Sequence, residues 1–140
     1  MTTSRKRPKE QKESKLSLKN QVIEYDPENN PPRFSLKLLI KGKKFGWESL
    51  EKTEKIKFAD KIHRLSQYSW AELRHIGRHS LGSEKISKDS LKFMIPIGVP
   101  KECDILVFRF DSLAGMLGFR SAFGTFYIIA FDGKFKAYEH

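Results

Sequence analysis

Four side chains in the last third of the sequence could act together on a phosphate group: Arg109, Arg120, Tyr138 and His140. Arginine stabilises negative charge on phosphate oxygens, tyrosine can orient or stack on a nucleotide, and histidine can transfer protons near neutral pH. We therefore treat these four residues as candidates for binding a phosphate group and for catalysis at it. Alternatively, the two arginines are structural and pair with nearby carboxylates, which are Asp104, Asp111 and Asp132.

Basic residues elsewhere would attract the same kind of partner. The chain has 140 residues and a net charge of +10, which favours RNA or another polyanion as partner. The first 20 residues contain seven basic and two acidic side chains, so they carry half of that charge. The candidate nucleic-acid-binding residues are Arg5, Lys6 and Arg7 in this segment and Lys134 and Lys136 near the other end.

Several classes of function lack support in the sequence. There is no G-x-x-x-x-G-K-[ST], G-x-G-x-x-G, G-x-S-x-G or C-x-x-C motif, so we expect no cofactor. His75 and His79 have a metal-binding spacing, but Gly77 lies between them and no third ligand is near, so we expect no metal. The single cysteine, Cys103, fits a reducing cytoplasm, and no apolar run is long enough for a transmembrane helix. We therefore expect a cytoplasmic protein with no membrane partner.

The elements that must position the candidate residues are mainly strands. Residues 105–110, 115–120 and 125–131 read as three long strands, and residues 134–138 as a short fourth piece. In the third strand, alternation places one set of side chains on one face of the sheet, Phe126, Ile128 and Ala130. The other set, Tyr127, Ile129 and Phe131, lies on the opposite face. Residues 34–41 suggest a first strand, and residues 92–95 a short one. A ribonuclease would need Arg109, Arg120 and Tyr138 to converge in one cleft.

Two helices are predicted between the first strand and the terminal strands. Residues 53–68 carry an apolar stripe that should be buried, formed by Ile56, Ala59, Ile62 and Leu65. Ser69 and Glu72 form a capping box, so a second helix should begin at Trp70 and end near Gly77.

These elements predict an α+β fold. We expect a small twisted antiparallel sheet packed by two helices, with a disordered basic N-terminal tail. Residues 1–32 would be the tail and a hinge rich in proline and asparagine, and residues 33–140 a single domain.

This order of elements, with arginines in the terminal sheet and a closing tyrosine and histidine, resembles the RelE/ParE superfamily of small bacterial toxins. The resemblance covers about residues 33–140 and concerns element order and sheet pattern. It implies a basic endoribonuclease that cuts messenger RNA, with Arg109, Arg120, Tyr138 and His140 at the matching positions, and an antitoxin protein as a possible partner. ParE-like members poison gyrase and are not nucleases, so a non-catalytic module that binds RNA or a protein is the alternative.

Overall fold

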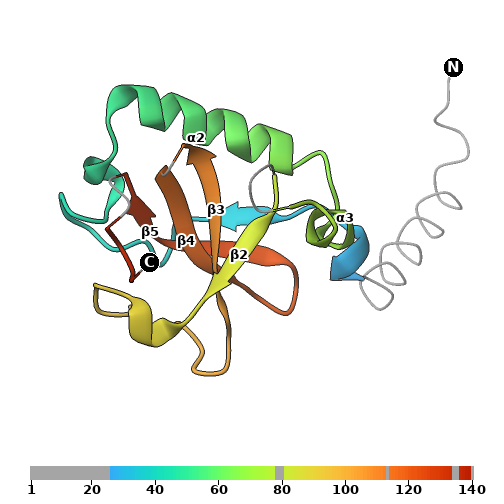
Figure 1. The fold of residues 1–140 in the computed structure, drawn as a ribbon. Helices are drawn as coiled ribbons and strands as arrows, with labels where there is room; N and C mark the ends of the chain where they lie inside the picture. Colours follow the sequence, from blue (N-terminus) through green and yellow to red (C-terminus); the bar gives the residue numbers. More distant parts are fainter. Residues whose placement is uncertain (1–25, 78–80, 113, 134–135, 140) are drawn as a thin grey trace, which may run out of the picture.

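The computed structural model describes residues 26–77, 81–112, 114–133 and 136–139 (Figure 1). Its centre is a five-stranded sheet with the order β1-β5-β4-β3-β2. The strands are β1 (Arg33–Ser35), β2 (Ser83–Ile86), β3 (Ile105–Asp111), β4 (Ala114–Arg120) and β5 (Thr125–Asp132). The pair β1–β5 is parallel and the other three pairs are antiparallel, so the sheet is mixed. The α+β class is confirmed, with a parallel edge strand that the prediction did not include.

Two α-helices pack on the sheet, α2 (Lys52–Leu65) and α3 (Trp70–Arg74), and Figure 1 shows α2 above the strands. Short 3-10 helices are η2 (Pro27–Asn29), η3 (Trp47–Ser49) and η4 (Lys88–Ser90). The predicted capping box is confirmed: the Ser69 hydroxyl accepts from the Glu72 amide, and the Glu72 carboxylate accepts from the Ser69 amide. The helix ends at Arg74 and not near Gly77.

The three predicted terminal strands are confirmed as β3, β4 and β5. The predicted first strand is shorter, because the chain turns after Ser35 and the Leu39 amide donates to the Leu36 carbonyl. The predicted strand at residues 92–95 is wrong, since the next strand of the sheet is β2 at Ser83–Ile86. In the described part of residues 134–138, Tyr138 forms an isolated bridge with Leu91.

A β-bulge in β5 decides which side chains face the helices. Leu117 pairs with Ala130 and Gly118 with Ile128, which leaves Ile129 as the extra residue. A Cβ atom on Gly118 would lie 2.0 Å from the Tyr127 carbonyl oxygen, so this approach of the two backbones requires glycine. The prediction from strict alternation, which put Ala130 on the same face as Phe126 and Ile128, is therefore wrong beyond the bulge. Phe131 shares the helix face with those two residues, and Ala130 packs on the other face.

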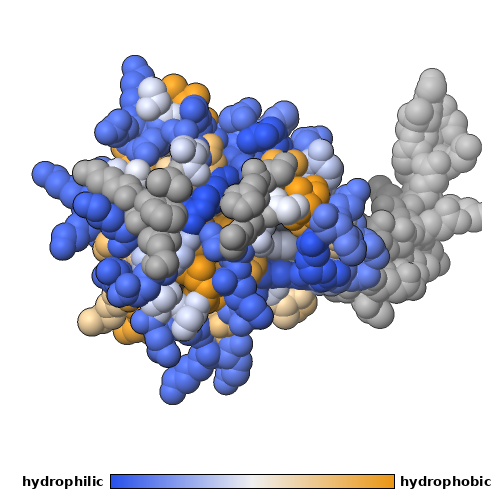
Figure 2. All heavy atoms as spheres, in the orientation of Figure 1, coloured by the Kyte–Doolittle hydropathy of each residue, from blue (hydrophilic) through white to orange (hydrophobic). Residues whose placement is uncertain are grey.

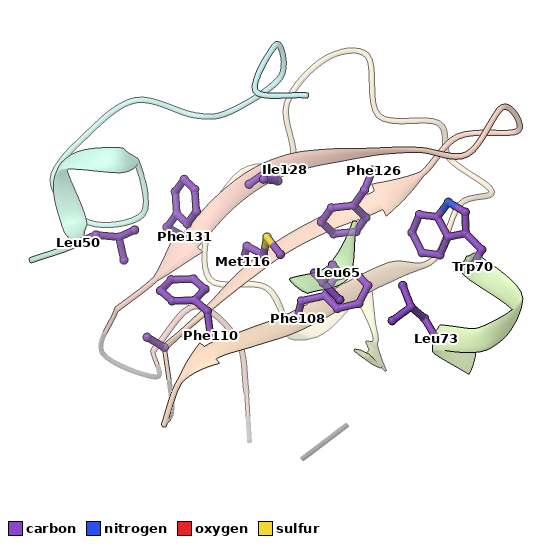
Figure 3. Close-up of a cluster of buried hydrophobic side chains, with 11 residues drawn as sticks. Leu50, Leu65, Trp70, Leu73, Phe108, Phe110, Met116, Phe126, Ile128 and Phe131 are labelled. Carbon is purple, nitrogen blue, oxygen red and sulfur yellow. The ribbon is translucent and has the colours of Figure 1, made fainter. Parts of the chain in front are cut away.

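The core on the helix face contains Leu65, Trp70, Leu73 and Phe108 among its buried residues (Figure 3). The predicted stripe of α2 is only partly buried. Leu65 is buried and Ile62 half-buried, but Ile56 and Ala59 are exposed. Phe58 decides this rotation of the helix, because its ring packs edge-on against Trp47, Phe110 and Phe131. The same rotation buries Lys61, which is 1% exposed.

Candidate functional site

Arg109 and Arg120 lie on opposite faces of the sheet. Arg109 follows Val107 on the face away from the helices, and Arg120 pairs with Phe126 and stacks on Trp70 on the helix face. A strand places alternate side chains on opposite faces, so the two guanidinium groups are separated by the sheet itself. The structure therefore does not bring Arg120 together with Arg109 and Tyr138.

Arg120 belongs to a cluster that links the beginning of the described chain to α3 and β4. Its guanidinium carbon lies 4.8 Å from the centre of the Trp70 ring, and it pairs with the Glu28 carboxylate. The same carboxylate also pairs with Arg74 of α3. The Trp70 indole donates to the Gly124 carbonyl oxygen at 2.9 Å. These contacts connect η2, α3 and β4, and they give Arg120 a structural role.

Arg109 forms a compact polar cluster with Glu84 and Tyr138. Its Nη2 donates to Glu84 Oε1 at 2.9 Å and also to the Tyr138 hydroxyl. The Tyr138 hydroxyl donates to the same Glu84 oxygen at 3.1 Å. About one fifth of each charged side chain is exposed, so the cluster lies at the boundary of the core. The structure thus brings together two of the four predicted catalytic residues.

The arginines are paired, as the structural alternative required, but with other partners than predicted. Glu84 and Glu28 take the places that were assigned to Asp104, Asp111 and Asp132. Asp104 pairs with Lys85, Asp111 with Lys57, and Asp132 accepts from two backbone amides. Sequence proximity was misleading because Glu84 reaches Arg109 across the β2–β3 pairing, where Glu84 stands opposite Val107.

The environment of Tyr138 keeps its hydroxyl protonated at neutral pH. Burial raises the pKa of Tyr138 to about 12; the Glu84 carboxylate also raises it, and Arg109 partly offsets the rise. A phenol with this pKa is a hydrogen-bond donor and not a base. Its chemistry at neutral pH is therefore orientation of a neighbouring group and not proton abstraction.

A pocket of about 590 Å³ opens beside Tyr138. Its lining comes from three separate stretches of the chain and comprises Lys43, Lys44, Phe45, Ser49, Lys92, Asp132, Gly133, Lys136, Tyr138 and Glu139. We call this the lysine pocket. Four lysines face two carboxylates there, and Lys92 pairs with one of them, Glu139, at 3.4 Å.

Asp132 holds the last part of the chain against the lysine pocket. This carboxylate is 1% exposed and accepts hydrogen bonds from the backbone amides of Lys136 at 2.8 Å and Ala137 at 3.2 Å. The Lys92 amide donates to the Ala137 carbonyl oxygen, which ties residues 91–92 to the same segment. The hydrogen bonds from these amides partly offset the negative charge of Asp132. The positive charge of the lysines therefore dominates the open part of the pocket.

The lysine pocket offers the groups that a nucleotide strand needs. Ammonium groups bind phosphate as mobile point charges, and the half-buried ring of Phe45 provides an aromatic surface beside them. Two of the predicted site residues, Lys136 and Tyr138, line this pocket, whereas the sequence analysis did not select Lys43, Lys44 or Lys92. The basic turn at residues 41–44 was a visible signal, whereas nothing local connected Lys92 with it.

The remaining predicted site residues, Arg5, Lys6, Arg7, Lys134 and His140, lie outside the described residues. Within the described ranges, no group of three or more histidine, cysteine or acidic side chains is arranged to hold a metal ion. Among the same residues, no helix has the length and apolar character needed to cross a membrane.

Comparison of the chain with protein-family models, with curated proteins and with solved structures gave no match.

Proposed function

We propose that this protein binds single-stranded RNA in the lysine pocket and acts as a non-catalytic module. The observation that carries the proposal is the convergence of Lys43, Lys44, Lys92 and Lys136 on one pocket with Tyr138 in its wall. Four ammonium groups in a pocket of this size suit consecutive phosphates of a flexible strand better than one small anion. The exposed bases of single-stranded RNA would pack on the half-buried ring of Phe45.

The arrangement of the arginines favours binding over cleavage. A phosphate in the lysine pocket would be near Arg109 and Tyr138, but Arg120 lies on the other side of the sheet. Arg109 is already paired with Glu84, which reduces the positive charge that it can offer to a transition state. Tyr138, with a pKa of about 12, would not serve as the base that activates a 2′-hydroxyl.

Fluorescence anisotropy with a labelled single-stranded RNA tests the proposal. The variant K43A/K44A/K136A removes three pocket lysines and should lower the affinity at least about tenfold. The slope of log affinity against log salt should become shallower by about 2, because roughly 0.7 counterions are released per phosphate contact. The matched control K52A/K57A/K85A removes the same charge from residues that do not line the pocket, and it should change the affinity less than about threefold. Equal losses in both variants would show that net charge, and not the pocket, attracts RNA.

A second candidate function is the RelE-like endoribonuclease, which would have an antitoxin protein as partner. The observation in its favour is the hydrogen bond between Arg109 and Tyr138, since both residues were carried over from the resemblance and Tyr138 lines the pocket. Purified protein incubated with RNA in EDTA separates the two functions. Cleavage that is lost in Arg109→Ala and kept in Lys52→Ala would establish the enzyme, whereas tight binding without cleavage would establish the module.

A further inference from the structure

Two large apolar side chains project from the loop that joins η4 to β3. Met94 is 89% exposed and Ile97 is 99% exposed, so nearly the whole of each side chain is in contact with solvent. Figure 1 shows this part of the chain, yellow to light orange, on the opposite side of the molecule from α2. Exposing two apolar side chains to water only three residues apart is unfavourable. Their exposure therefore indicates a contact with another surface.

A basic segment of the chain, residues 36–44, lies directly beside this loop. A Cβ atom on Gly98 would lie 3.2 Å from Leu38 Cδ2, and the rings of Phe45 and Phe93 are 5.5 Å apart. The two segments are residues 36–44 and 91–100, and we call them together the loop surface. They carry Lys37, Lys41, Lys43, Lys44 and Lys92 but no aspartate or glutamate. Leu36, at 52% exposure, adds a further apolar group.

We propose that the loop surface binds an anionic lipid membrane. Met94 and Ile97 would enter the boundary between headgroups and acyl chains, while the lysines contact anionic headgroups. The two side chains project from a loop, as insertion into a bilayer requires, whereas a peptide or protein partner would bury them in a groove of its own. Lys92 pairs with Glu139 from a neighbouring segment at 3.4 Å, and the other four lysines match a surface of uniform negative charge.

This proposal differs from the expectation of no membrane partner because the two concern different modes of contact. That expectation rested on the lack of an apolar run long enough to span a bilayer. A loop that inserts two side chains at the interface requires no spanning segment, and its exposure is a property of the fold that the sequence pattern does not display.

Sedimentation of the full-length protein with vesicles tests the proposal. The protein should bind vesicles of phosphatidylcholine mixed with phosphatidylserine, and bind pure phosphatidylcholine at least about tenfold more weakly. The variant M94S/I97S should lower the affinity for the mixed vesicles at least about tenfold, because it removes the inserted apolar groups. The variant K37A/K41A should weaken binding about tenfold through lost charge alone. Lack of sedimentation of the unmodified protein with the mixed vesicles would overturn the proposal.

Two controls separate this result from the RNA proposal. Neither Met94 nor Ile97 lines the lysine pocket, so M94S/I97S should keep its RNA affinity and its melting temperature. If M94S/I97S binds the mixed vesicles as tightly as the unmodified protein, the lysines alone attract the membrane and insertion of the loop is refuted. Vesicle binding without RNA binding would refute the proposed function and leave the membrane surface standing.

Discussion

The two faces of the sheet each hold one arginine, but they surround it differently. On the helix face, Arg120 stacks on Trp70 and shares the Glu28 carboxylate with Arg74, so it closes the edge of an aromatic core. On the opposite face, Arg109 pairs with Glu84 and with Tyr138, and Tyr138 borders the lysine pocket. The same residue type thus completes a core on one side and supports a polar site on the other.

The difference arises from what covers each face. Two helices with large side chains cover the face of Arg120, and a guanidinium there is stabilised by an aromatic ring and one half-buried carboxylate. Loops cover the face of Arg109, and loops leave room for a pocket and for side chains that reach solvent. Function should therefore be sought on the loop-covered face, and stability on the helix-covered face.

The largest expected effect is on the helix face, at Trp70. Trp70→Ala removes a buried ring, the indole hydrogen bond to Gly124 and the stacking surface of Arg120. We expect a loss of roughly 3–5 kcal/mol in the free energy of unfolding, measured by urea denaturation. Leu36→Ala, at a half-exposed position outside this core, should cost less than about 1 kcal/mol. A loss below about 1 kcal/mol for Trp70→Ala would mean that the ring is not part of the core.

The next effect concerns Lys61, which the helix buries against the same core. Burial, and to a smaller extent the charge of Arg64, lower the pKa of Lys61 from its usual value to about 8. At about pH 7 Lys61 is protonated in both the folded and the unfolded chain, and burial makes this charge unfavourable in the fold. The fold should therefore gain stability when Lys61 loses its proton, and Lys61→Met removes this dependence on pH. Lys57→Met, at an exposed position on the same helix, should change stability by less than about 0.5 kcal/mol.

The pH dependence provides an independent check on Lys61. The folded-state pKa lies below the unfolded value of about 10.4, so the unfolded chain binds more protons between roughly pH 8 and 10. The stability of the unmodified protein should therefore rise with pH across this window relative to Lys61→Met. The difference in the free energy of unfolding between the two proteins should change accordingly, and a difference that stays constant from about pH 8 to pH 10 would contradict the assignment.

A smaller effect is expected on the loop-covered face. Tyr138→Phe keeps the buried ring but removes the hydroxyl that bonds to Glu84 and Arg109. We expect a loss of about 1 kcal/mol by urea denaturation. Tyr127→Phe is the matched control, because Tyr127 stacks on Phe119 through its ring, and it should change stability by less than about 0.5 kcal/mol. Equal losses in the two variants would show that the Glu84–Arg109–Tyr138 cluster does not stabilise the fold.

The smallest expected effect is the change in RNA affinity when either arginine is replaced, and it compares the two faces of the sheet directly. Arg120→Gln lies across the sheet from the lysine pocket, so it should change RNA affinity by less than about twofold in the anisotropy assay. Arg109→Gln should change it more, since Arg109 bonds to the hydroxyl of Tyr138, a residue that lines the pocket. A larger loss for Arg120→Gln than for Arg109→Gln would reverse our assignment of the functional face.

The sequence by itself determined the features that depend on local interactions. The three terminal strands follow from short apolar runs separated by turn-like stretches, and the start of α3 follows from a capping box that four consecutive residues complete. These features, with α2, are sufficient for the α+β class. Lys136 and Tyr138 were also predicted at one edge, because both lie in a single short segment.

The tertiary structure alone decided the relations between distant segments. Alternation places side chains within one strand, but the relative faces of Arg109 and Arg120 depend on strand register, and a single bulge exchanged Ala130 and Phe131. Glu84 and Glu28 became the partners of the arginines across 25 and 92 residues of chain. The lysine pocket and the burial of Lys61 likewise depend on how loops and helices pack, and packing is a sum of non-local contacts that no short window of sequence contains.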